Sequence, residues 1–218
     1  KKRARKNKKG ATPSQSNVVL FPHLNEINDS LADNLICLFI GINPGVQTAI
    51  TGHAYAHKSN WFWKLLHSST CVDRLLPPHY DNHLPRLFSL GCTNLVPRPT
   101  ANQTQISEQE KRDGVPVLVN KIVRHRPESV CFVGKDIWKT FHKVYFGAAM
   151  DEKAFEFGWQ RAPATGKLEE VDEDDGWSGA RIFVSFSTSG LVSFSPEFKK
   201  LTWSKLGEFV NERRVARG

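Results

Sequence analysis

An asparagine directly after an apolar stretch is the first residue whose position suggests chemistry. Residues 35–40, LICLFI, are followed by Gly-Ile-Asn-Pro-Gly at residues 41–45. Pro44 fixes its own backbone and keeps Asn43 extended, while Gly45 allows the chain to turn sharply. A neutral amide is neither a strong base nor a nucleophile, but it can position a water molecule through hydrogen bonds. The alternative is an ordinary Asn-Pro-Gly turn, which the triplet taken alone favours.

A loop of small hydroxyl side chains is the second candidate, Ser-Thr-Ser-Gly-Leu-Val-Ser at residues 187–193. Hydroxyl and backbone N–H groups suit phosphate oxygens, and Gly190 allows a ligand to approach closely. Leu191, if it projects beyond the loop, is an apolar wedge able to fill the gap left by an extruded DNA base. If Leu191 instead packs inward, the loop only leads into the next helix.

The elements that must position these residues can be predicted from short apolar segments at residues 35–40, 129–134 and 181–186. Each is rich in β-branched or aromatic residues, which is typical of parallel strands buried on both faces. A turn and a helical pattern follow each segment. This alternation predicts an α/β fold, a three-layer sandwich with a central, mostly parallel β-sheet flanked by helices.

Helices are expected at residues 59–69, 107–126, 135–146 and 195–214. Ser107 and Glu110 form a capping box at the start of the second of these helices, and Ser195 can cap the last. Gly114 and Pro116 should bend or split the second helix, because proline removes a backbone hydrogen bond.

Polar segments fall where the predicted strands end, at residues 41–45, 92–100, 134–136 and 187–193. They contain Asn43, Asn94, Lys135 and the hydroxyl loop. Ligands of parallel α/β sheets collect where the strands end, so we expect these residues to form one site.

The net charge of +8 is concentrated at one end of the sequence. Residues 1–10 carry seven basic and no acidic residues. We expect residues 1–17 to be a disordered basic tail that attracts nucleic-acid phosphates or acts as a nuclear address. The alternative is a solubilising end with no partner. Residues 18–218 are expected to form a single domain with an acidic loop around residues 168–178.

Two classes of protein are not expected from this sequence. No apolar run is long enough for a membrane span or a signal peptide, which favours a soluble, intracellular protein. The four cysteines, Cys37, Cys71, Cys92 and Cys131, lack metal-site spacing, so we expect buried reduced thiols and no metal. An iron–sulfur cluster is the alternative, and it fits poorly because Cys37 and Cys131 lie within predicted strands.

Five segments, taken in order, resemble the mismatch-specific uracil/thymine DNA glycosylase family of the uracil-DNA glycosylase superfamily. They are GINPG, TGHAYAHKSNWFWKLL, GCTNLVPRPT, FVGKDIW and STSGLVSF, and the resemblance spans about residues 35–212. It implies a monofunctional enzyme that flips and excises uracil from mismatched DNA and initiates base excision repair. Thymine and other deaminated or damaged bases are further candidate substrates. We expect a nuclear monomer whose partner is double-stranded DNA with a mismatched or damaged base, and no cofactor.

The resemblance also implies roles for residues of the base pocket. Asn43 would align the hydrolytic water below the sugar C1′ atom, and Tyr55 would stack on the flipped base. Backbone groups around Ile42 and the side chain of Asn94 would meet the polar edge of the pyrimidine. An amide at residue 43 gives up general-base catalysis, a contribution of typically 10²–10⁴-fold, so we expect a slow enzyme.

The remaining roles concern DNA and substrate choice. By the resemblance, the DNA backbone would be held by Ser187, Thr188, Ser189 and Gly190, with Lys135 as a further phosphate contact and Leu191 as the wedge. Vertebrate-type thymine glycosylases have a smaller alanine where this sequence has Thr48, and a histidine where it has Ala54. Thr48 would crowd the methyl group of thymine, so uracil should be processed better than thymine. His57 could contact phosphate or substrate, and the alternative is a solvated histidine.

Two rival functions stay open at this point. One is a catalytically silent DNA-binding module in which Asn43 is only a turn residue. The other is an iron–sulfur uracil-DNA glycosylase.

Overall fold

The computed structural model describes residues 24, 26–161, 167–168 and 176–218. The predicted basic tail at residues 1–17 and most of the predicted acidic loop lie outside the described residues. None of the helices in the described part is long and apolar enough to cross a membrane.

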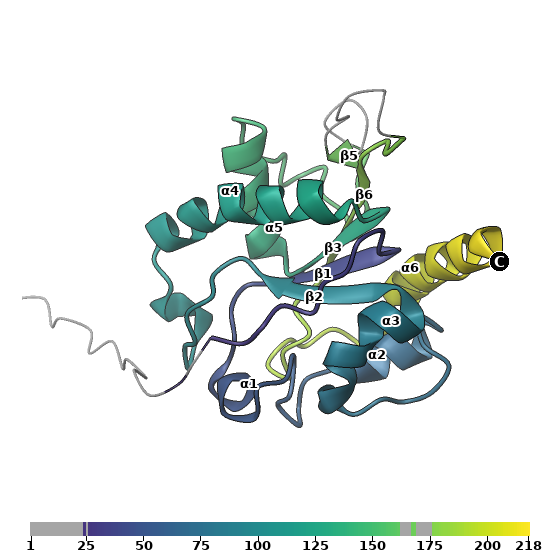
Figure 1. Ribbon diagram of the computed structural model, residues 1–218. Coiled ribbons are helices and arrows are strands. Elements are labelled where there is room, and N and C mark those ends of the chain that lie inside the picture. Colours follow the sequence, from purple (N-terminus) through teal and green to yellow (C-terminus); the bar gives the residue numbers. More distant parts are fainter. Residues whose placement is uncertain (1–23, 25, 162–166, 169–175) are drawn as a thin grey trace, which may run out of the picture.

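A six-stranded sheet forms the centre of the fold, in the order β2-β1-β3-β6-β4, with β5 also paired with β6 (Figure 1). The strands are β1 (Cys37–Gly41), β2 (Leu90–Asn94), β3 (Ser129–Val133), β4 (Gly158–Trp159), β5 (Lys167–Leu168) and β6 (Ala180–Ser185). The first four in this order are parallel, while β4 and β5 run antiparallel to β6. The three predicted strands are confirmed as β1, β3 and β6, with ends shifted by one or two residues.

Strand β2 was not predicted, because glycine and asparagine are poor strand formers and two of its five residues are Gly91 and Asn94. Its pairing with β1 explains its conformation. The register places Leu90 opposite Cys37 and Asn94 opposite Gly41. Tertiary pairing thus overrides a weak local preference.

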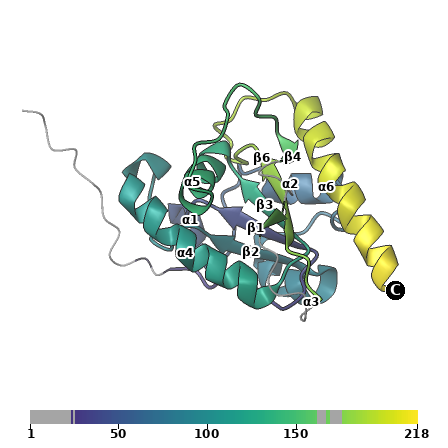
Figure 2. The same ribbon diagram turned by 90° about the horizontal axis from the view of Figure 1, so that it is seen from above.

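Helices cover both faces of the sheet, and Figure 2 shows the layers from above. The helices are α1 (Val46–Thr51), α2 (Phe62–Ser68), α3 (Leu84–Phe88), α4 (Glu108–His125), α5 (Lys135–Tyr145) and α6 (Pro196–Arg217), with short 3-10 helices η1 (Pro78–His83) and η2 (Gln103–Gln105). Alternate residues of β1 serve different cores: Cys37 and Phe39 pack with α2 and α6, and Leu38 and Ile40 pack with α4 and α5. The predicted three-layer α/β sandwich is therefore confirmed.

Helix α4 begins as predicted but does not split. The Ser107 hydroxyl accepts from the Glu110 N–H, and the Glu110 carboxylate accepts from the Ser107 N–H. The helix continues through Pro116 to His125, so the expectation of a split is wrong. Its buried face packs against α5 and the sheet, which offsets the lost backbone bond. Gly114 permits this packing, because a Cβ atom there would lie 2.2 Å from the Leu95 carbonyl oxygen.

Candidate active site

The residues expected at the site converge at the carboxyl ends of the parallel strands, around a cavity of about 670 Å³. The cavity is lined by Ile42, Asn43, Thr48, Tyr55, His57, Asn94, Ser187, Thr188, Ser189 and Leu191, among others. Gly190 and Lys135 are the two expected site residues outside this lining. A second cavity of about 460 Å³ lies between α4 and α5, and it contains none of the expected site residues.

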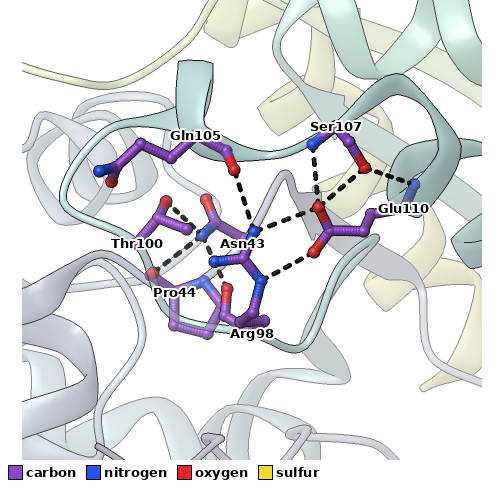
Figure 3. Close-up of polar contacts among 7 residues, drawn as sticks. All are labelled: Asn43, Pro44, Arg98, Thr100, Gln105, Ser107 and Glu110. Carbon is purple, nitrogen blue, oxygen red and sulfur yellow. Dashed lines mark hydrogen bonds and ion pairs between the residues drawn. The ribbon is translucent and has the colours of Figure 1, made fainter. Parts of the chain in front are cut away.

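The side chain of Asn43 is held in one orientation. Its Nδ2 atom donates to the Arg98 carbonyl at 2.9 Å, the Thr100 hydroxyl at 2.8 Å and the Pro44 carbonyl at 3.2 Å (Figure 3). Two of these partners are carbonyl oxygens, which only accept, so the NH₂ group and not Oδ1 must face them. No described residue bonds to Oδ1 of Asn43, and this atom stays available to order a water molecule.

Arg98, whose backbone carbonyl accepts from Asn43, forms an ion pair with Glu110 outside the cavity. The Arg98 guanidinium donates to the two carboxylate oxygens of Glu110 at 2.7 and 3.1 Å and to the Gln105 carbonyl at 3.0 Å (Figure 3). These bonds from Arg98 are the main reason that the pKa of Glu110 falls to about 2, and the Ser107 hydrogen bonds contribute. The sequence predicted the capping box of Glu110 but contained no sign that it also binds Arg98.

Tyr55 forms part of the cavity wall through a strained backbone and a stacked ring. Its φ angle is +54°, in the left-handed region that side chains rarely adopt. The ring lies on Phe62 with centroids 3.9 Å apart and planes at 13°. Because Phe62 covers one face of the ring, only the opposite face can receive a base.

The hydroxyl group of Tyr55 is buried, and it is without a hydrogen-bond partner in the described part of the chain. Burial raises the pKa of this hydroxyl well above its ordinary value, so it stays a neutral donor. A Cβ atom on Gly41 would lie 3.2 Å from the hydroxyl and 2.6 Å from Oδ1 of Asn94. Glycine at residue 41 therefore leaves room for both polar groups beside the end of β1.

Asp81 is a cavity residue that the sequence analysis missed. Its side chain is buried, its Oδ2 atom accepts from the Ala54 N–H at 2.7 Å, and its Oδ1 atom lies 3.0 Å from Nδ1 of His53. Oδ1 also accepts from the Asn82 N–H at 2.8 Å. Both oxygens are thus engaged in holding the loop that leads to Tyr55. No motif marks Asp81 in the sequence, because Ala54 and His53, which it links, lie 27 and 28 residues away.

Two further residues expected in the base pocket lie at its wall. Thr48 is buried in α1 and lines the cavity. The Ile42 carbonyl already accepts from the Val96 N–H at 2.9 Å, which extends the pairing of β1 with β2 beyond the strand ends. That carbonyl is therefore a structural acceptor rather than a free one.

The hydroxyl loop is attached to the segment before α2 and leaves its leucine in solvent. The Thr188 carbonyl accepts from the Trp61 N–H at 2.8 Å. Gly190 lies against Ser59, where a Cβ atom would come within 2.4 Å of the serine hydroxyl. The Leu191 side chain is 92% exposed. The alternative in which Leu191 packs inward is wrong, because Gly190 occupies the inward position.

Of the remaining candidates, His57 lines the cavity and Lys135 does not. His57 is exposed, and its Nδ1 atom lies 2.8 Å from the Ser59 hydroxyl. Lys135, at the start of α5, is 3.3 Å from a carboxylate oxygen of Glu152 and lies over the Phe155 ring. The structure therefore does not bring Lys135 into the cavity.

All four cysteines are buried and unpaired. Burial raises the pKa of each thiol, so none is a reactive thiolate. Among the described residues, no group of three or more His, Cys, Asp or Glu could hold a metal ion. The arrangement of these thiols gives no support to an iron–sulfur centre.

Comparisons with known proteins agree with this geometry. The family model of the Uracil DNA glycosylase superfamily matches residues 29–207. A protein of Schizosaccharomyces pombe, named G/U mismatch-specific uracil DNA glycosylase, is 32% identical over 210 residues. That alignment covers 94% of this chain and 60% of the yeast protein, so the chain spans less than two thirds of its relative. A family match over most of the sequence, on the predicted fold and with this cavity, shows that the chain belongs to the uracil DNA glycosylase superfamily.

Proposed function

We propose that this chain is a monofunctional DNA glycosylase that excises uracil from mismatched double-stranded DNA. The observation that carries the proposal is the shared cavity of Asn43, Tyr55 and Asn94, with the exposed Leu191 at its edge. The name of the yeast relative supports G·U pairs as the substrate.

Base extrusion would begin at the hydroxyl loop. Ser187 and Ser189 are partly exposed and would offer their hydroxyl groups to the phosphates of the distorted strand, whereas Thr188 is buried and would support the loop from within. Leu191 then fills the gap in the duplex, as apolar wedges do in proteins that unstack bases. Extrusion costs a few kcal/mol and costs least for a mismatched base, which favours G·U over correctly paired sites.

The chemical step is hydrolysis of the bond between C1′ and the base nitrogen. Oδ1 of Asn43 accepts a hydrogen bond from a water molecule and directs its oxygen toward C1′. The new C–O bond forms as the C–N bond breaks, the bonding electrons leave with the base, and the water proton passes to solvent or to the departing base. The amide of Asn43 is too weak a base to accept that proton, and both oxygens of Asp81 already accept hydrogen bonds within the protein. A slow reaction is therefore expected.

The lining also supports a monofunctional reaction. None of the described residues that line the cavity is a lysine, so no amine is available there for a Schiff base with the sugar. The product would be free base and an abasic site, which initiates base excision repair.

Substrate choice would depend on Asn94 and Thr48. The amide of Asn94 can pair with the imide edge of uracil, and the buried Thr48 narrows the cavity. A thymine methyl group needs additional space, so we propose the order uracil before thymine. Other deaminated or damaged bases would be accepted according to their fit.

The partner would be double-stranded DNA with a mismatched or damaged base, bound by a monomer. Seven basic residues within residues 1–10 would add nonspecific attraction to the DNA, and such a segment can also serve as a nuclear address. We therefore propose the nucleus as the location of the protein.

The test uses a labelled duplex with one G·U pair, incubated with the protein and then treated with alkali. Cleavage at the uracil is expected with the wild-type protein, and Asn43→Ala should abolish it while keeping affinity for abasic product DNA. If the wild-type protein binds the duplex but gives no cleavage above a buffer control, the DNA-binding module replaces the enzyme. If active protein absorbs visible light as an iron–sulfur protein does, the assignment within the superfamily is wrong.

A further inference from the structure

We infer that the Arg98–Glu110 ion pair positions the side chain of Asn43 for catalysis, although neither residue lines the cavity. The inference rests on the proposed function, because it assigns Asn43 the task of directing water.

Arg98 connects the ion pair to Asn43, because its side chain binds Glu110 and its backbone carbonyl accepts from the Asn43 amide. The Arg98 guanidinium is fixed by Glu110 and by the Gln105 carbonyl, and the Arg98 backbone carbonyl accepts from Nδ2 of Asn43. The separation along the chain between Asn43 and Arg98 is 55 residues. Fixing the guanidinium limits rotation of the Arg98 peptide, and its carbonyl is one of the three acceptors that orient the Asn43 amide.

The surrounding backbone makes this support stiff. Arg98 lies between Pro97 and Pro99, which restrict the conformations of the segment. The Thr100 N–H donates to the Pro44 carbonyl at 3.1 Å, so the same segment is bonded to the loop that carries Asn43. The contacts in this support that depend on side-chain charge are those of the Arg98 guanidinium with Glu110 and with the Gln105 carbonyl, and the ion pair with Glu110 can be removed by a single substitution.

Glu110 has a second, separable task in the capping box of α4. It accepts from the Ser107 N–H at 2.9 Å and from the Ser107 hydroxyl at 2.9 Å, while its bonds to Arg98 use both oxygens. The alternative is that the pair only attaches α4 to the loop before it. The two tasks can be separated by substitution, because glutamine also serves in capping boxes but cannot form an ion pair.

The experiment compares Glu110→Gln with Ser107→Ala. Glu110→Gln keeps a capping-box residue and removes the charge that holds Arg98, whereas Ser107→Ala removes the cap and leaves the contacts between Arg98 and Glu110. For each variant, the single-turnover rate constant of uracil excision at saturating protein, the affinity for abasic product DNA and the melting temperature are measured.

Glu110→Gln is expected to lower the excision rate constant by at least about 10-fold, since a misplacement of 1 Å can cost roughly 10²-fold. Affinity for product DNA should change by less than about twofold, because the pair does not contact the cavity. Ser107→Ala should lower the melting temperature with less than about twofold effect on the rate constant. Arg98→Lys should reproduce the loss seen with Glu110→Gln, and the double variant should lose no more than the worse single variant, because the two residues act as a unit.

A readout independent of activity is the side-chain amide of Asn43 in nuclear magnetic resonance, assigned by its loss in Asn43→Ala. Its protons should exchange with solvent faster in Glu110→Gln than in the wild type, and no faster in Ser107→Ala. The inference is overturned if Glu110→Gln leaves both the exchange and the excision rate at the level of Ser107→Ala. If the wild-type protein does not excise uracil but the exchange difference is present, the proposed function fails and the positioning stands.

Discussion

At the scale of single residues, some polar groups of the cavity already have hydrogen-bond partners within the protein and others do not. Nδ2 of Asn43 and both oxygens of Asp81 are bonded to the protein, and an amide such as Asn43 is neither an acid nor a base in water. Oδ1 of Asn43 and the Tyr55 hydroxyl lack partners among the described residues. Oδ1 of Asn43 can therefore bind a water molecule, whereas the Tyr55 hydroxyl is buried, and the proposed catalysis would depend on orientation of that water.

The Tyr55 hydroxyl gives a prediction about stability. A buried polar group without a partner costs about 1–3 kcal/mol, so Tyr55→Phe should raise the melting temperature of the free protein while keeping the ring on Phe62. Thermal unfolding of both proteins is the measurement. Tyr80→Phe, at a partly exposed ring outside the cavity, is the matched control and should change the melting temperature little. A clear loss of stability in Tyr55→Phe would mean that the hydroxyl has a bound water partner in solution.

At the scale of elements, the hydroxyl loop is held by hydrogen bonds before and after its exposed residue Leu191. The Thr188 carbonyl is bonded to the Trp61 N–H before the leucine, and the Val192 carbonyl accepts from Nζ of Lys199 at 3.2 Å after it. Lys199 is buried, and its ammonium group lies 4.4 Å from the centre of the Trp61 ring. This loop is thus a fixed support for Leu191 rather than a free tether.

Leu191→Ala tests the wedge. The variant should lose excision on well-paired duplexes containing uracil, because the gap left by the flipped base is no longer filled. Single-stranded DNA has no such gap, so its rate should change little. Single-turnover rates on both substrates are the measurement, and an equal loss on both would refute the wedge.

The start of α4 gives a prediction about pH. The pKa of Glu110 lies at about 2, below its ordinary value of 4.5, so its ion pair with Arg98 stabilises the folded protein at pH values above about 4.5. That stabilisation is lost as the pH falls toward 2. Both side chains are about one third exposed, which limits the contribution to roughly 0.2–1 kcal/mol. Urea unfolding of the wild type and Glu110→Gln should show a gap at pH 7 that closes near pH 2, and a gap independent of pH would contradict the assignment.

At the scale of the whole molecule, the cavity and the cluster of basic residues lie in different parts of the chain. The residues that line the cavity lie between Ile27 and Val192, and nearly all of them fall in the range 29–207 that matches the superfamily, whereas seven basic residues are concentrated in residues 1–10. The proposed recognition of a base and the proposed general attraction to DNA can therefore be separated experimentally.

Deletion of residues 1–10 should weaken binding to undamaged duplex DNA and flatten its salt dependence, by about 0.9 in slope for every DNA phosphate that this segment neutralises. The single-turnover excision rate at saturating protein should stay the same, because the cavity is untouched. Fluorescence anisotropy over a series of salt concentrations is the measurement. A neutral segment of equal length is the control for chain length, and an unchanged salt slope would rule out DNA binding by this segment.

Features that depend on neighbouring residues could be predicted from the amino-acid sequence. Strands β1, β3 and β6 follow from short apolar runs, the start of α4 follows from its capping box, and the Asn-Pro-Gly turn places Asn43 at a strand end. These features can be predicted from the sequence because each depends on steric effects or hydrogen bonds within a few residues. For Leu191 the sequence left both an exposed and an inward position open, and the folded loop shows that it is exposed.

Features that join distant segments became visible only in the folded molecule. The bond from Asn43 to Arg98 spans 55 residues, that from Ala54 to Asp81 spans 27, and β2 becomes a strand only through β1. Pro116 does not divide α4, because the buried face of the helix packs against the sheet. Such contacts leave no local pattern, since their energy arises only when the packed layers bring the groups together and exclude water from between them.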